Sequence, residues 1–397
     1  MEIEDPNQML LKKQLEVFRK TCLKQEVYDA LTDDLTGKIK HSLRFRGQIA
    51  FRHIIPTLVN HKAYEFLNDA EQMFLRRSTG LFIRYKKLKK KYGNVDTNKI
   101  RGYRPYKNAS EETDFNKERI KLMSAALFQL DMSVFDLVHY IGGPHKATHR
   151  NVDKIRRCIS HLDDEIIEQY MERIVYGAPQ VCDAYSSDKN FMAYYKYGNH
   201  KSVEKEEEEF RKTMIKDSKR GNTMLLDKDL TLFIPHLHLT PQGIVDVGNK
   251  HKSSRPVFDS SFRPEEFCKA INDWIDPELE GDITFGDSIR TFLRVLFNLR
   301  ISYPNIRIYL GDNDITNAFC LIKYNPAMVA LHAFIGLGYL GLCTGQTFGN
   351  NASPANFDIA VVVCRDHASY LWQNDHERCM DEAKEYVENM SFDVQCE

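Results

Sequence analysis

The stretch LGDNDITNAFCLIKYNP, residues 310–326, decides how the fold of the chain is interpreted. The mostly apolar residues 306–310 predict a buried strand, and Asp312 and Asp314 follow it directly. Phe319 comes shortly afterwards, before a second apolar stretch. Acids at the end of a buried strand have two explanations: an Asp that caps the following helix, or ligands of a divalent metal ion.

In the second interpretation, Asp312, Asp314 and the backbone carbonyl of Ile315 offer the hard oxygen ligands that Mg²⁺ prefers in proteins. Two such ions about 4 Å apart activate a hydroxyl and stabilise a leaving pyrophosphate in nucleotidyl transfer. Phe319 would then lie beyond a tight turn, where its ring can stack under a sugar.

Upstream, the stretch KSSRPVFDS at residues 252–260 places Lys252 and Arg255 just before a short apolar strand. Basic side chains on a strand can bind phosphates, because the arginine fork matches two phosphate oxygens. The alternative is an ordinary charged β-hairpin.

Downstream, the stretch CTGQTFGNNASPANFD at residues 343–358 combines glycines and asparagines in a predicted loop. Ser353 and Pro354 are typical of the N-cap and first residue of a helix. A glycine loop before a helix, here with Gly349, lets the backbone approach a base or phosphate closely. Taken alone, this stretch is an ordinary join between a loop and a helix.

Together and in this order, the three stretches resemble the fingers and palm of reverse transcriptases. The likeness extends to YIGGPHKATHR (140–150) and LTLFIPHLHLTPQGIV (230–245), which resemble reverse-transcriptase-like proteins of mobile elements in eukaryotic microbes, and it covers about residues 120–365. It implies an RNA-directed DNA polymerase that uses Mg²⁺ or Mn²⁺, deoxynucleoside triphosphates and an RNA or DNA template–primer. The roles it implies are a catalytic metal ligand at Asp314, a steric gate at Phe319, triphosphate contacts at Lys252 and Arg255, and a pocket for nucleotide and template shaped by Gly349, Ser353 and Pro354.

A polymerase palm also needs a second acidic motif, usually Tyr-x-Asp-Asp on a hairpin, and the sequence contains none. The nearest candidate, CMDEAKEYV at 379–387, is typical of an exposed helix. We therefore expect an incomplete palm. The resemblance implies descent from a polymerase, but polymerase activity would require a complete palm. The alternative is a non-catalytic nucleic-acid-binding fragment of a retroelement.

The chain of 397 residues, of which 42% are hydrophobic, has room for two or three domains. The pattern of residues along the chain predicts an α+β protein with three regions. These are a basic helical region at 1–110, a helical region at 111–222, and an incomplete right-hand fingers and palm with an antiparallel sheet at 223–397. Although the net charge is only −1, basic residues gather at 84–94 and acidic residues at 204–209, the latter on an exposed helix. A basic face indicates an anionic partner, and a solvated helix face is the alternative. The basic residues that we expect to bind nucleic acid are Arg84, Lys86, Lys87, Lys89, Lys90 and Lys91.

Nine cysteines without a Cys-x-x-Cys pair indicate reduced thiols in an intracellular compartment, cytoplasmic or nuclear. The polar N-terminus does not resemble a secretory signal, and no apolar run is long enough to span a membrane. His145 and His149 have a spacing that can bind zinc on a helix, but a structural role is favoured. We also expect hydrogen-bonded histidines in HLHL at 236–239, a helix start at HLDDE (161–165), and an amphipathic helix at 286–304.

Overall fold

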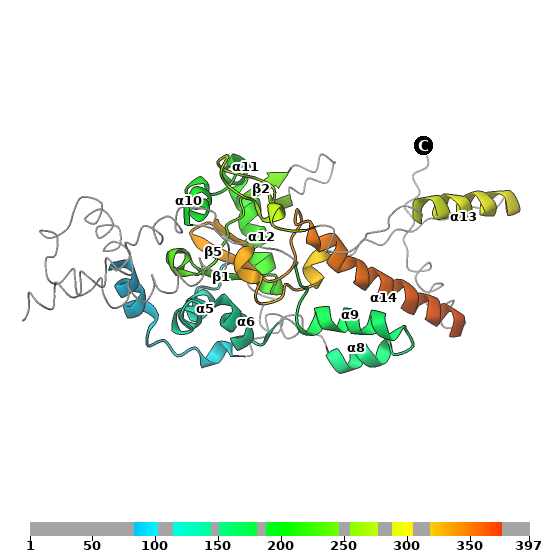
Figure 1. Cartoon of the computed structure of the whole chain (residues 1–397), viewed down its shortest axis with the longest axis horizontal. Helices are drawn as coiled ribbons and strands as arrows, with labels where there is room; N and C mark the ends of the chain where they lie inside the picture. Colours follow the sequence, from blue (N-terminus) through cyan, green and yellow to red (C-terminus); the bar gives the residue numbers. More distant parts are fainter. Residues whose placement is uncertain are drawn as a thin grey trace, which may run out of the picture.

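The computed structural model describes residues 83–101, 114–143, 151–180, 188–245, 255–276, 288–304 and 318–374. Helices and two small antiparallel sheets mix in these ranges, as an α+β fold requires (Figure 1). The helices are α5 (Lys117–Gln129), α6 (Val134–Tyr140), α8 (Val152–Cys158), α9 (Asp164–Val175), α10 (Asp188–Tyr197), α11 (Lys201–Lys205), α12 (Glu207–Arg220), α13 (Ser288–Ser302) and α14 (Ala352–Asn374). The strands are β1 (Thr223–Asp227), β2 (Gln242–Val245), β3 (Arg255–Phe258), β4 (Ala333–Gly336) and β5 (Tyr339–Cys343), and the 3₁₀ turns are η2 (Asn98–Ile100), η4 (Lys228–Phe233), η5 (Ile271–Asp273), η6 (Phe319–Leu321) and η7 (Val329–Leu331).

The larger sheet has the order β1-β5-β4, and both of its pairings are antiparallel. Strands β4 and β5 form a hairpin within the apolar stretch at 329–343. Its two turn residues, Leu337 and Gly338, both have positive φ, as a tight two-residue hairpin turn requires. Gly341 of β5 pairs with Phe334 of β4, and a Cβ there would lie 2.3 Å from the Phe334 ring. The Phe334 ring therefore packs directly on the backbone of Gly341.

Helix α5 covers the larger sheet and packs against β1. Asn116 caps the helix by accepting from the amide of Arg119, and Leu127 and its neighbours Ala125 and Ala126 are almost fully buried. The core that they form runs from Leu88 to Cys343 in sequence, so residues of all three predicted segments share it.

The stretch between β1 and β2 differs from the prediction. The sequence there predicts β-structure from 230 onward, but residues 228–233 form η4, and only Gln242–Val245 form a strand, β2, which pairs with β3. Asp227 ends β1 and caps η4, because its Oδ1 accepts from the amide of Asp229 at 2.9 Å. A side-chain cap, which apolar periodicity does not reveal, therefore turns the chain.

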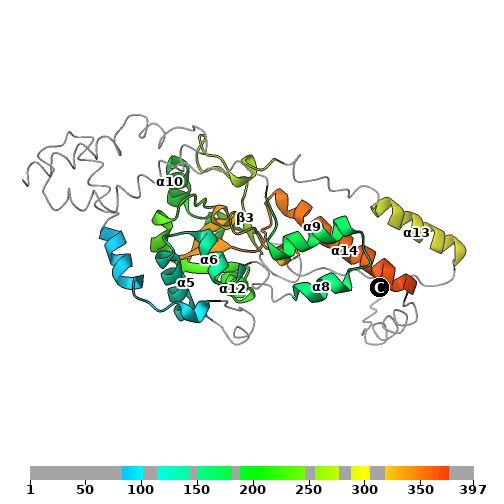
Figure 2. The same ribbon diagram turned by 60° about the horizontal axis from the view of Figure 1, so that its bottom comes forward.

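A smaller cluster joins α8 and α9 to α14 through the buried side chains of Ile159, Ile167, Met171 and Val363. Helix α14 runs beside α9 in both views (Figures 1 and 2). The predicted helix start at 161–165 is confirmed, since Asp163 caps α9 by accepting from the amide of Glu165. The predicted exposed acidic helix is also confirmed over α11 and α12, with a break at Glu206.

Helix α13 is present within the predicted range of 286–304, but none of its side chains that the structure describes is buried. It lies apart from the core in both views, and Val295 and Leu299 of its expected inner face are 49% and 40% exposed (Figure 2). Periodicity identifies the helix but does not supply an element to cover it. None of the helices in the described ranges has both the length and the hydropathy that crossing a membrane requires.

Candidate functional site

The loop between β5 and α14, residues 344–351, lies against the end of β3. Gly349 has φ +91°, and a Cβ at this position would lie 2.3 Å from the carbonyl oxygen of Phe258. Only glycine permits both this backbone conformation and this close approach. The predicted glycine loop and the predicted phosphate-binding strand, which are far apart in the sequence, are therefore neighbours.

Asn272 attaches the same loop a second time. Its side-chain amide donates to the carbonyl of Gly349 at 2.8 Å, and its carbonyl oxygen accepts from the amide of Asn351 at 3.0 Å. The Asn272 amide group also donates to Ser261, and its backbone N–H donates to the carbonyl of Ser260. One asparagine therefore joins the chain after β3 to the loop before α14.

A buried polar network supports the loop from beneath. Tyr324 stacks on His332 with ring centroids 3.9 Å apart, and its hydroxyl oxygen accepts from the Thr347 backbone amide and from Asn350 Nδ2, both at 3.2 Å. Gln180 Oε1 accepts from Asn350 Nδ2 at 3.2 Å and lies 2.9 Å from His332 Nε2. The network fixes the loop through side chains from several separate segments.

His332 and His238 are held in the neutral form by burial. Burial, and then the neighbouring His238, lower the pKa of His332 to about 3. Burial likewise lowers the pKa of His238 to about 3, and its Nδ1 has no hydrogen-bond partner in the described part of the chain. The expectation that the histidines of HLHL are hydrogen-bonded is therefore wrong for Nδ1 of His238. The His238 ring packs against the rings of Tyr194 and Trp274 instead.

Phe319 lies at this loop, as part of an aromatic cluster. Its ring centroid is 4.8 Å from that of Phe348 and 5.8 Å from that of Phe357. Phe348 is 52% exposed, so the cluster reaches the surface. Such faces are suited to stacking on a base or a sugar. The sequence signal for Phe348 is its position just before Gly349, which by itself does not indicate a stacking role.

Ser353 lies at the loop but does not cap the helix. Helix α14 begins at Ala352, whose amide donates to Asn350 Oδ1 at 2.8 Å, and Ser353 Oγ donates to the carbonyl of Thr347 at 2.9 Å. The prediction of Ser353 as N-cap and Pro354 as first helical residue is therefore wrong in register. Pro354 is tolerated because its missing N–H falls in the first turn, where amides have no helical partner. Ser353 ties the loop to the helix instead.

Gln346 was not predicted, and its environment is unusual. It is fully buried, and neither polar atom of its side-chain amide has a hydrogen-bond partner within the described ranges. Its backbone amide donates to the carbonyl of Ile322, and its carbonyl accepts from the thiol of Cys320. Buried unpaired polar groups are rare in proteins, and each one needs a specific explanation. Gln346 therefore adds an unsatisfied amide next to the segment that directly follows the predicted acidic motif.

The predicted metal ligands Asp312, Asp314 and Ile315 lie outside the described residues, as do Lys252 and the side chain of Arg255. The two carboxylates and the backbone carbonyl of the three predicted metal ligands are oxygen donors of the kind that suits Mg²⁺ or Mn²⁺. Within the described ranges, no group of three or more His, Cys, Asp and Glu side chains is placed to hold a metal ion. The histidines at 145 and 149 and the stretch 379–387 also lie outside these ranges.

The predicted basic residues form an exposed face on the helical residues 83–92, which we name the basic helix. All six of them are exposed, while Leu88 and Tyr92 face the core. Asp227 accepts from Lys91 Nζ at 2.5 Å and from the hydroxyl of Tyr92 at 2.6 Å. The basic helix lies at the opposite end of the core from the start of α14 (Figures 1 and 2). It is therefore a separate surface from the loop.

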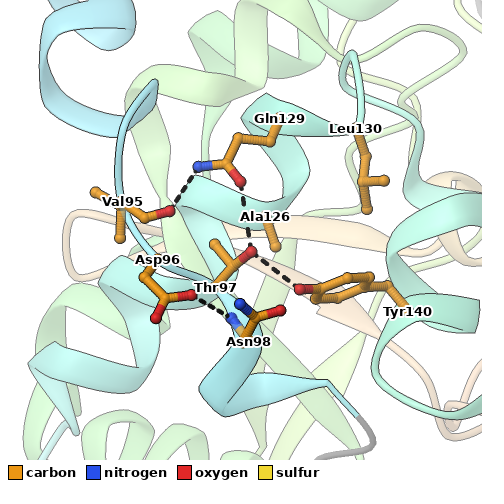
Figure 3. A pocket seen from close by; sticks show the side chains of 8 residues that line it. All are labelled: Val95, Asp96, Thr97, Asn98, Ala126, Gln129, Leu130 and Tyr140. Atoms are coloured by element: carbon orange, nitrogen blue, oxygen red, sulfur yellow. Dashed lines mark hydrogen bonds between the residues drawn. The ribbon is translucent and has the colours of Figure 1, made fainter.

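A pocket of about 310 Å³ lies where the chain after the basic helix meets α5 and α6 (Figure 3). Polar groups of its wall hydrogen-bond within the protein. The Gln129 side-chain amide donates to the carbonyls of Tyr92 and Val95, and Thr97 Oγ1 lies 3.0 Å from the hydroxyl of Tyr140. These bonds hold the basic helix on α5. The pocket does not reach the loop at 344–351.

Comparisons with known proteins do not assign the chain. No protein-family model matches it, and neither curated proteins nor solved structures give a match. The sequence motifs and the geometry of the loop, β3 and the basic helix are therefore the features from which a function can be inferred.

Proposed function

We propose that the chain is a reverse-transcriptase-like protein, an RNA-directed DNA polymerase by descent, which binds nucleotide and template–primer around the loop at 344–351. One observation carries the proposal: three stretches far apart in the sequence meet at this loop. Gly349 touches the end of β3, and Phe319 touches Phe348. A charged hairpin or an ordinary loop-to-helix join, each a sufficient explanation of one stretch alone, does not require the three to meet.

The proposed site divides the work of nucleotidyl transfer among its residues. Lys252 and Arg255 bind the triphosphate, Phe319 excludes a sugar with a 2′-hydroxyl, and Asp314 with Asp312 and Ile315 holds Mg²⁺ or Mn²⁺. The metal ions would activate the primer hydroxyl and stabilise the pyrophosphate. Gly349, Ser353 and Pro354 shape the floor of the pocket.

The test is primer extension on an RNA template with Mg²⁺ or Mn²⁺. Catalysis despite the incomplete palm requires extension by the wild-type chain, a loss of at least about 10³-fold in Asp314→Asn, and no loss in the exposed control Asp153→Asn. Phe319→Ala should extend with ribonucleotides more readily relative to deoxyribonucleotides. No extension by the folded wild-type chain with either metal would contradict catalysis.

A second candidate function, non-catalytic binding of nucleic acid, is favoured by the basic helix. Exposed lysines on one helix can neutralise phosphates along a single strand, which gives binding that tolerates any sequence and weakens steeply with salt. This function needs neither a complete palm nor a metal ion.

Anisotropy of labelled single-stranded RNA, titrated at several salt concentrations, tests the second function. Replacing Lys87, Lys89 and Lys90 by Gln should lower the slope of log K against log salt by about 2, since each phosphate contact on a single strand contributes about 0.7. The matched control replaces the exposed Lys201, Lys205 and Lys216, which removes the same charge from α11 and α12. Equal slopes for the two triple variants would rule out a binding role for the basic helix.

A further inference from the structure

Two histidines meet where the turn between α8 and α9 touches α14. His161 Nε2 and His367 Nδ1 are 3.2 Å apart, and both side chains are half-buried. Tyr370, one turn further along α14, stacks on His161 with ring centroids 3.7 Å apart and an interplanar angle of 18°. We propose that His161 and His367 form a binding site for a divalent transition metal such as Zn²⁺, which joins α14 to α8 and α9.

The distance between the two nitrogens suits shared coordination. Zinc–nitrogen bonds of about 2.0–2.1 Å in a tetrahedral site place two ligating nitrogens about 3.3 Å apart. The observed separation of 3.2 Å is close to this value. A bound ion would replace the direct hydrogen bond between the two nitrogens, and both lone pairs would then be directed at the ion.

The packing of the rings also suits a metal. The stacked Tyr370 restricts rotation of the His161 ring, as outer contacts do in established metal sites. The site belongs to two separate elements, so a bound ion would hold them together.

Water completes the coordination, because no third His, Cys, Asp or Glu side chain lies within reach in the described ranges. Each histidine does end a Cys-x-x-His pattern, with Cys158 and Cys364 exposed. Exposed thiolates bind the same metals. Both cysteines must therefore be replaced before the imidazole pair is tested.

The experiment measures Zn²⁺ and Ni²⁺ binding by calorimetry in a Cys158→Ser/Cys364→Ser chain. We expect at least about tenfold weaker binding in His161→Asn and in His367→Asn, since loss of an outer-shell partner alone costs that much. His139→Asn, at an exposed position on α6, should bind as the parent does. The metal should also raise the thermal midpoint of the parent but not that of the two site variants.

Absence of binding, or equal binding by the parent and both site variants, would overturn the proposal. Circular dichroism without metal shows whether each variant is folded. Because both imidazoles are only half-buried, we expect all the variants to fold. The result is independent of polymerase activity.

Discussion

Helices α5 and α13 have similar length and similar apolar content but opposite surroundings. Helix α5 lies on β1 and buries Leu122, Leu127 and most of its other residues. Helix α13 has large apolar side chains that are 40–65% exposed, including Leu293 and Phe297. Both are correctly predicted as helices, since periodicity is local. The difference teaches that the pattern of a helix does not say what will cover it.

The largest expected effect separates these two helices directly. Leu127→Ala should lower the free energy of unfolding by about 2–5 kcal/mol, because Leu127 is fully buried and leaves a cavity. Leu293→Ala on α13 is the matched control and should cost less than about 0.5 kcal/mol. Chemical denaturation measures both. Equal losses would mean that α13 is covered in solution.

A second expected effect concerns the buried histidines of the core. His238 and His332 have pKa values of about 3 in the folded chain, against about 6.5 when unfolded. The unfolded chain therefore binds more protons below pH 6.5, and stability that is complete above this value falls as the pH decreases. From pH 8 to pH 5 we expect a loss of about 2 kcal/mol for each histidine.

Denaturation at several pH values measures this loss. His332→Gln should reduce the loss between pH 8 and pH 5 by about 2 kcal/mol, whereas the exposed His139→Gln should leave it unchanged. An unaltered pH dependence in His332→Gln would show that this imidazole is not held neutral by the core.

Glycines with positive φ allow a comparison within the loops. Gly349→Ala should cost about 1–3 kcal/mol more than Gly338→Ala, because both have φ above +80° but only Gly349 faces a backbone oxygen. Denaturation of the two variants isolates the contact with β3 from the backbone conformation. Similar costs would indicate that the loop can separate from β3.

The smallest expected effect concerns the attachment of the basic helix. Tyr92→Phe should lower the free energy of unfolding by about 1 kcal/mol, because Asp227 loses one of its hydrogen bonds. Burial alone would raise the pKa of Asp227, but the bonds from Lys91 and Tyr92 hold it below its ordinary value. Lys91→Ala removes a more exposed partner and should cost no more than Tyr92→Phe does. A larger loss in Lys91→Ala would mean that charge, not burial, anchors this helix.

Much of the candidate site follows from local sequence. Strand β3, the loop that contains Gly349 and the exposed basic face are predicted from residue type and spacing. Three other features are not predicted: the cap of α14, the turn η4 and the unpaired side chain of Gln346. Each of them depends on a side chain from elsewhere or on depth in the core. The network of Gln180, Tyr324 and His332 is of the same kind, since a lone polar residue has no periodic signal.

By itself, the sequence predicted many of the described helices and strands, showed where the lysines gather, and supplied the three motifs on which the proposed resemblance to a polymerase rests. These properties depend on neighbouring residues and on steric limits of the backbone. Only the tertiary structure decided that Gly349 touches Phe258, that α5 is buried and α13 exposed, and that His161 meets His367. Such contacts join residues far apart in the chain, and their energies depend on packing that no local pattern records.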